Sequence, residues 1–282
     1  MVISIRARSA SEPYHHAHHS LSSSLVMILC LLPASDYDPT ESAVVWHALT
    51  RAGIPVRFAT PTGQPAHADV RLVESGFKML NPMLMTRKED LALYAYMIRD
   101  PAFLAPQSYA DVNPEEFDGL LVPGGHAAGM RSLLESARAQ AIALHFFQAN
   151  KPVAAVCHGV LLLARTRHPD TGKSVLHGRK TTALTALNME LPAWAVTAPW
   201  LGNYYRTYPT TVEAEVKAAL ASPDDFARGP LLPIRDSAGN HHHGFTVRDG
   251  NYLSARWPGD CHRLAAQFVA LVQAAYPKPV SA

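Results

Sequence analysis

Cys157 is the residue of this sequence whose neighbours point most directly to chemistry. It lies in Val153-Ala-Ala-Val-Cys-His-Gly159, where small and β-branched residues run into the cysteine and an apolar segment follows. This pattern is typical of a buried strand that turns sharply into a helix, the thiol version of a nucleophile elbow. The N–H groups and dipole of the following helix favour the thiolate. We therefore predict that Cys157 is a catalytic nucleophile rather than an inert buried cysteine.

Two further groups could complete such a site. A glycine pair in Val122-Pro-Gly-Gly-His126 follows a short apolar strand and exposes backbone N–H groups. If that strand lies beside the one before Cys157, the N–H groups of Gly125 and His158 form an oxyanion hole. Glu41 begins the first predicted helix, and its carboxyl could face the sulfur and handle a proton. The simpler alternatives are a plain glycine turn and a helix acid that offsets the dipole.

The elements that must position these groups alternate between strands and helices. Strand patterns cover 25–32, 54–60, 119–122, 152–156, 181–187, 245–247 and 252–255, and helix patterns cover 41–52, 136–149, 159–165, 211–220 and 260–275. Residues 64–117 are predicted to be a loop-rich insertion with helices, and Arg248-Asp-Gly-Asn251 indicates a hairpin. We expect an α/β fold: a flavodoxin-like, doubly wound, mostly parallel sheet with helices on both faces.

The overall composition narrows the class of protein. The 282 residues are 48% hydrophobic and 17% charged, which is typical of a globular protein, and we expect a polar, disordered tail at 1–24 and a single domain over 25–278. The net charge of +2 and the lack of a basic stripe argue against a nucleic-acid partner. No apolar run reaches the ~20 residues of a membrane span. Three cysteines without a Cys-x-x-Cys pair argue against a disulfide framework and structural zinc, and they favour a cytoplasmic protein.

Two histidine clusters, His15–His19 and His241–His243, could suggest metal binding. The first lies in the predicted tail and the second in a polar loop before Gly244. Adjacent histidines rarely all face one ion. We therefore expect neither cluster to be a metal site.

Several of these motifs together resemble the ThiJ/PfpI superfamily, within the class I glutamine amidotransferase-like fold. The residues that carry the resemblance are Glu41, Gly53, Phe58-Ala-Thr-Pro-Thr-Gly63, Phe117-Asp-Gly119, Pro123-Gly-Gly-His126 and Ala155-Val-Cys-His-Gly159. The chain length and the insertion are similar to those of the heat-shock-inducible branch. Members of that branch are glutathione-independent glyoxalases, which convert methylglyoxal to lactate, and they are also described as holdase chaperones and protein deglycases.

This resemblance implies specific roles for individual residues. Lys180-Thr-Thr-Ala-Leu-Thr185 matches a segment of the branch, and Glu190 stands where an acid follows that segment. The implied site is a Cys157–His158–Glu190 triad with Glu41 as the proton-handling acid. The implied chemistry needs no cofactor or metal, and family members are commonly homodimers.

Some segments depart from the branch, and these differences bear on the substrate rather than on the fold. Asp36-Tyr-Asp-Pro-Thr40 replaces a longer aromatic-rich stretch, and Ala255-Arg-Trp-Pro-Gly259 replaces an Asn-Pro or Gln-Pro turn. The segment 195–205 has no familiar counterpart, and its Trp200, Tyr204 and Tyr205 could shape a different pocket. Two other functions fit the same residues. One is a cysteine hydrolase, amidase or peptidase, and the other is a holdase chaperone or redox-stress sensor without turnover.

Overall fold

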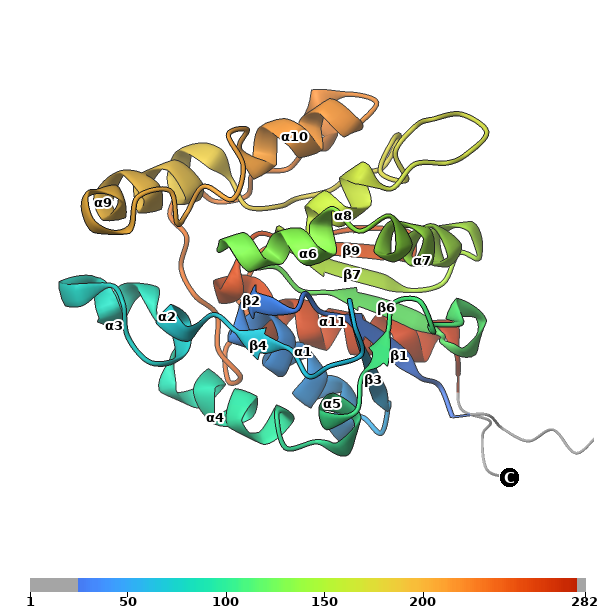
Figure 1. Cartoon of the computed structure of the whole chain (residues 1–282). Coiled ribbons are helices and arrows are strands. Elements are labelled where there is room, and N and C mark those ends of the chain that lie inside the picture. The colour runs from blue at the N-terminus through green and yellow to red at the C-terminus, as the bar shows by residue number, and fades with distance from the viewer. Residues whose placement is uncertain (1–24, 278–282) are drawn as a thin grey trace, which may run out of the picture.

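A computed structural model describes residues 25–277, so the predicted tail at 1–24 and its histidine cluster lie outside the described residues. The strands of the main sheet are β1 (Ile28–Leu31), β3 (Val56–Thr60), β5 (Gln107–Ser108), β6 (Gly119–Val122), β7 (Val153–Val156), β8 (Thr246–Asp249) and β9 (Tyr252–Ala255). They are ordered β5-β3-β1-β6-β7-β9-β8, and every neighbouring pair is parallel apart from β8 with β9 (Figure 1). Two further strands, β2 (Ser35–Tyr37) and β4 (His67–Ala68), form a separate parallel pair.

Helices cover both faces of the sheet (Figure 1). One face carries α1 (Pro39–Arg51), α4 (Lys88–Met97) and α11 (Cys261–Ala275), and the other carries α6 (Arg131–Leu134), α7 (Ala137–Gln148) and α8 (Gly159–Arg165). The remaining helices are α2 (Val70–Val73), α3 (Asn81–Leu84), α5 (Pro101–Leu104), α9 (Leu191–Leu201) and α10 (Val212–Ala219). None of the helices in the described part of the chain is long and apolar enough to cross a membrane.

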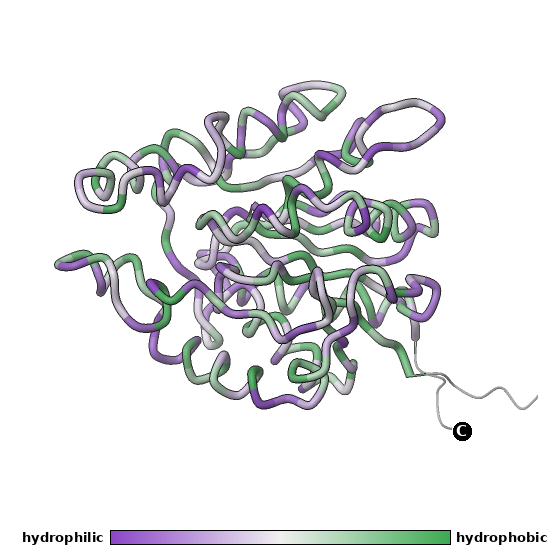
Figure 2. Tube along the Cα trace, viewed as in Figure 1, coloured by the Kyte–Doolittle hydropathy of each residue, from purple (hydrophilic) through white to green (hydrophobic). Residues whose placement is uncertain are grey.

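The core explains why these segments form parallel strands. Every residue of β1, β6, β7 and β9 is buried, because helices cover both faces of the sheet at these positions. Figure 2 shows hydrophobic residues along the central strands and hydrophilic residues in many of the outer loops. The predicted flavodoxin-like α/β fold is therefore confirmed. Its topological switch point lies between β1 and β6, where parallel α/β folds commonly place their sites.

One predicted strand, 181–187, is wrong. Thr181 makes only an isolated bridge with Phe226, and residues Ala186–Glu190 form a π-helical turn that leads into α9. The physical reason lies in the side chains of β9. The Ser254 hydroxyl accepts a hydrogen bond from the Thr182 N–H at 3.0 Å, so a side chain takes the place of a strand partner at this position.

The sequence patterns also missed helix α9. Its residues are almost uniformly apolar, and Pro199 lies inside it, so they show neither helical periodicity nor a clear helix end. The segment with α2 and α3 contacts the segment with α9 through a small apolar cluster around Leu72, Phe77 and Tyr205. These two segments lie together at one end of the sheet (Figure 1).

Candidate active site

Cys157 occupies the sharp turn between β7 and α8 that its sequence context predicted. Its φ angle is +82°, a left-handed backbone conformation that residues other than glycine rarely adopt. Such strain costs on the order of 1–3 kcal/mol and persists only where the surroundings enforce it, often at functional sites. Gly159 follows in close contact with the Val122 and Pro123 backbone, where a side chain would clash. Cys157 itself is 4% exposed.

Glu41 reaches the same place from the first turn of α1. Asp38 caps this helix, because its Oδ1 accepts hydrogen bonds from the Thr40 N–H at 2.8 Å and the Glu41 N–H at 3.2 Å. The Glu41 carboxyl is completely buried, and its Oε2 accepts the Gly124 N–H at 2.7 Å. Among residues 25–277 no nitrogen or oxygen donor is in hydrogen-bonding geometry with Oε1, and the neighbouring Cys157 thiol interacts with the carboxyl. The structure therefore brings Glu41 to the sulfur.

The glycine pair after β6 lies against the cysteine turn. A Cβ atom on Gly124 would lie 2.7 Å from the Val156 carbonyl oxygen and 2.8 Å from the His158 nitrogen. The His158 N–H favours a negative charge on the Cys157 sulfur, and the Gly125 N–H has no hydrogen-bond acceptor within residues 25–277. Both donors of the predicted oxyanion hole thus belong to backbone segments that meet beside the sulfur.

The side chain of His158 has different partners from those of the predicted triad. Its Nε2 lies 3.2 Å from the Thr207 hydroxyl, and its Nδ1 is buried and has no hydrogen-bond partner in the described part of the chain. Glu190 instead accepts the Val212 N–H at 2.9 Å and lies 3.5 Å from the Arg206 guanidinium. The structure therefore does not join Glu190 to His158, because the first N–H of α10 and Arg206 occupy that carboxylate.

Burial and mutual repulsion control the protonation of the site. Burial raises the pKa of the Cys157 thiol well above its usual value, and the Glu41 charge raises it further. Burial also raises the pKa of Glu41, and the neighbouring Asp38 adds to this. The effect of the helix dipole is therefore smaller than the effects of burial and of the Glu41 charge, contrary to the simplest expectation from the sequence. A thiolate at Cys157 requires the proton to stay on Glu41, so the pair titrates as a unit.

The two histidines near the sulfur are neutral at physiological pH. Burial lowers the pKa of His158 to about 3, with contributions from His126 and Arg165. Burial likewise lowers the pKa of His126 to about 3. A neutral imidazole can accept a proton but offers no positive charge to stabilise an anion.

Aromatic residues after α9 cover the glycine loop. The His126 ring stacks on Tyr205 with centroids 4.2 Å apart and an interplanar angle of 18°, and the Tyr204 ring meets it edge-on at 4.8 Å. The Tyr204 hydroxyl donates to Asp69 at 2.5 Å. Of the three aromatic residues singled out in this segment, Tyr204 and Tyr205 thus lie beside the site, whereas the Trp200 ring contacts Lys78.

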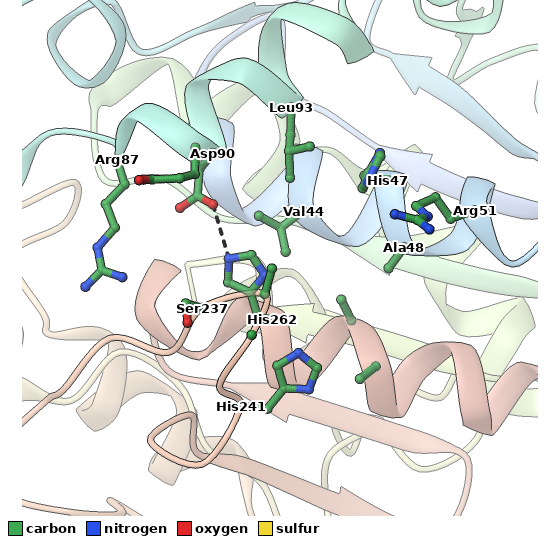
Figure 3. A pocket seen from close by; sticks show the side chains of 15 residues that line it. Val44, His47, Ala48, Arg51, Arg87, Asp90, Leu93, Ser237, His241 and His262 are labelled. Atoms are coloured by element: carbon green, nitrogen blue, oxygen red, sulfur yellow. Dashed lines mark hydrogen bonds and ion pairs between the residues drawn. The ribbon is translucent and has the colours of Figure 1, made fainter.

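A separate cavity of about 770 Å³ lies between α1, α4, α11 and the loop around Ser237 (Figure 3). His262 points across it, and its Nε2 lies 3.2 Å from an oxygen of Asp90. The His241 and His262 rings are stacked, with their centroids 6.5 Å apart. Across residues 25–277, no group of three or more histidine, cysteine, aspartate or glutamate side chains is arranged to hold a metal ion. Cys157, Glu41 and His158 do not line this cavity.

The fold and the site together define a class of protein. It is a flavodoxin-like α/β protein with a strained cysteine in a nucleophile elbow, a buried acid beside the sulfur and a glycine loop from the neighbouring strand. A family model described as ThiJ/PfpI family-like matches residues 32–230, and the chain belongs to this family.

Several relatives carry the names of enzymes. The chain is 28% identical over 166 residues to "Deglycase TK1284" of Thermococcus kodakarensis, covering 59% of this chain and 69% of that protein. It is 28% identical over 149 residues to "Glutathione-independent glyoxalase hsp3101" of Schizosaccharomyces pombe, covering 52% and 57%. Among solved structures, the fold is similar to glyoxalase III from Candida albicans, with a TM-score of 0.62 and 19% identity over 88% of this chain and 97% of that one.

Proposed function

We propose that this protein is a cysteine-dependent enzyme that converts 2-oxoaldehydes such as methylglyoxal to 2-hydroxy acids without glutathione. The observation that carries the proposal is the contact between the buried Glu41 carboxyl and the strained Cys157 thiol. This pair combines a nucleophile with an acid that can hold and return a proton. The relatives named as glyoxalase and deglycase support the same kind of aldehyde chemistry.

The reaction balances within this pair and one water molecule. The Cys157 thiolate adds to the aldehyde carbon and forms a hemithioacetal, whose oxygen takes the proton held by Glu41. Glu41 then takes the hydrogen of that carbon as a proton and gives an enediol, whose second oxygen is protonated. When Glu41 returns its proton to the second carbon and the first hydroxyl loses its proton, a 2-hydroxy thioester remains. Water hydrolyses the thioester, releases the 2-hydroxy acid and restores the thiol. The N–H groups of Gly125 and His158 stabilise the oxyanions that develop on the way.

A comparison of two buried cysteines tests this proposal. Cys157→Ser should lower the turnover of methylglyoxal at least about a thousandfold, because the alcohol is a far weaker nucleophile than the thiolate. Cys30, in the interior of β1, is the matched control. Cys30→Ala should keep turnover within about twofold of wild type when measured below its melting temperature.

The measurement is lactate formation from methylglyoxal without glutathione, run beside simple amides and short peptides. Lactate formation by Cys157→Ser at the wild-type rate would exclude the mechanism. Hydrolysis of amides by the wild type, without lactate formation, would show a cysteine hydrolase instead.

A further inference from the structure

Arg235 is a partly buried arginine whose charge is not paired. Within residues 25–277 its guanidinium makes no ion pair and donates no hydrogen bond. Two neighbouring arginines behave differently. Arg256 binds both carboxylate oxygens of Asp260 at 2.9 Å, and Arg87 donates to the Asp236 carbonyl at 3.0 Å. A partly desolvated guanidinium without a partner costs free energy unless a ligand pairs with its charge.

The sheet register places Arg235 at the edge where Cys157 lies. Strands β7 and β9 are parallel, and Val156 pairs with Ala255, so the residues that follow both strands emerge at the same edge. Trp257 is two residues beyond Ala255. The Arg235 guanidinium lies over its ring, 4.9 Å from the ring centroid. The unpaired Arg235 guanidinium therefore lies against Trp257, just after β9, and β9 is the strand next to β7, which leads to Cys157.

The backbone around Arg235 holds the side chain in place. A Cβ atom on Gly259 would lie 2.8 Å from the Arg235 Cγ, so the arginine stem packs directly on the glycine. The next residue, Asp236, donates its N–H to the Gly259 carbonyl at 2.7 Å and accepts the Arg263 N–H at 2.7 Å. A guanidinium that lies over one ring and whose stem packs on a glycine loses less freedom when it binds a ligand.

The charged groups near Arg235 include both signs. Asp38 acts on it with opposite charge, Asp90 does so from α4, and Arg87 acts with like charge. Within residues 25–277, neither Asp38 nor Asp90 forms an ion pair with Arg235. Two buried nitrogens after β7 and β9, His158 Nδ1 and Trp257 Nε1, have no hydrogen-bond partner within residues 25–277. Such atoms are expected where a polar ligand binds.

We propose that Arg235 binds a carboxylate of the substrate, so that the site favours small aldehydes that carry a negative charge. A guanidinium matches a carboxylate with two parallel hydrogen bonds. This proposal deepens the proposed function, because it rests on Cys157 being the attacking group and names the substrate class. Arg235 is then a specificity residue rather than a member of the proton-handling pair.

Two alkylating reagents test Arg235 without any turnover. Iodoacetate and iodoacetamide are nearly equal in size and differ in charge, and labelling of Cys157 by each is followed by mass spectrometry of its peptide. Arg235→Gln should lower the ratio of the iodoacetate rate to the iodoacetamide rate about fivefold or more, because the local attraction for anions is lost. Any change in the thiol pKa cancels in the ratio. Arg235→Lys should keep at least about half of the wild-type ratio, since the charge remains.

Arg51→Gln is the matched control, because Arg51 is exposed and lines the separate cavity. It should leave the ratio unchanged. A fall in the ratio confined to Arg235→Gln supports the proposal. An unchanged ratio in Arg235→Gln, or no labelling of wild-type Cys157 by iodoacetate, overturns it. Failure of the proposed function shows differently, as a wild type that forms no lactate from methylglyoxal while the reagent ratio still depends on Arg235.

Discussion

Helix α1 contributes to two regions of the molecule that differ in almost every physical respect. Its first turn supplies Glu41 to the Cys157 site, whereas Val44, His47 and Arg51 of the same helix line the cavity towards α4 and α11 (Figure 3). The cavity offers about 770 Å³ of space. The Cys157 site offers little exposed surface but concentrates strain and buried polar atoms.

The polar groups of the two regions are satisfied in different ways. In the cavity, His262 is paired with Asp90, while Arg51, Glu89 and His241 are exposed to water. At the sulfur, the Glu41 carboxyl is fully buried, His158 Nδ1 has no hydrogen-bond partner within residues 25–277, and the pKa values of the acid and the thiol are raised together. Desolvated, unpaired titratable groups mark chemistry better than volume does. The following predictions test this contrast with paired substitutions, one in each region.

The largest effect is expected from an acid-to-amide change. Glu41→Gln keeps the shape of the side chain and an acceptor for the Gly124 N–H, but it removes the proton that must move during turnover. Turnover of methylglyoxal should fall about a hundredfold or more, as is usual when a general acid–base is lost. Alkylation of Cys157 by iodoacetamide should stay within about threefold, because the neutral amide adds no charge to oppose the thiolate.

Glu89→Gln makes the same chemical change in the cavity and should leave turnover unaltered. Equal turnover by Glu41→Gln and wild type would remove Glu41 from the mechanism. A parallel loss of turnover and alkylation would make it a group that only activates the thiol.

The second prediction concerns the close approach of the glycine loop to the cysteine turn. The methyl group of Gly124→Ala would lie 2.7 Å from the Val156 oxygen and 2.9 Å from Glu41 Oε2, and the backbone atoms there cannot move away cheaply. We expect a loss of about 2–3 kcal/mol in the free energy of unfolding, which is typical of overpacking. Urea denaturation followed by far-UV circular dichroism measures this loss.

Gly239 provides the matched glycine on the rim of the cavity. Its Cβ position has no atom within 4 Å, so Gly239→Ala should change the free energy of unfolding by less than about 0.5 kcal/mol. Equal stabilities of the two alanine variants would mean that the loop and the turn are not in tight contact.

The sequence predicted the parts of the site that depend on local patterns. The cysteine turn follows from a short apolar strand that runs into Cys-His-Gly, and α8 was predicted over the range that the structure shows, Gly159–Arg165. Glu41 could be placed because the ends of parallel strands meet at one edge of a sheet. Each of these inferences needs only neighbouring residues and one general rule of topology.

The remaining parts depend on contacts between distant segments. Thr207 reaches His158 across 49 positions, and no pattern in its own segment predicts this. The resemblance to a family suggested Glu190 as the partner of His158, but Glu190 accepts the first N–H of α10 instead. No sequence pattern singles out Arg235; only the structure shows that its guanidinium lies on the Trp257 ring without an ion pair within residues 25–277. Side-chain pairing of this kind depends on tertiary packing, which periodicity does not report.

The smallest expected effect concerns the pH dependence of stability. Burial lowers the pKa of His158 to about 3, whereas the unfolded chain has a histidine pKa near 6.5. Between these values the unfolded state binds more protons, so His158 makes the protein less stable as the pH falls. The loss between pH 7 and pH 5.5 should be about 1 kcal/mol for this histidine. His158→Gln should remove that contribution, so its free energy of unfolding relative to wild type should rise by about 1 kcal/mol over the same interval.

The cavity again supplies the comparison. His241 is exposed, so His241→Gln should change the free energy of unfolding by less than about 0.5 kcal/mol at either pH. Urea titrations at pH 7 and pH 5.5 measure both variants, and the use of differences cancels the opposite contributions of Glu41 and Glu190, whose pKa values burial raises. If His158→Gln tracked wild type at both pH values, His158 would bind as many protons in the folded protein as in the unfolded chain. Its burial would then not control its charge, and the electrostatic contrast between the Cys157 site and the cavity would not hold.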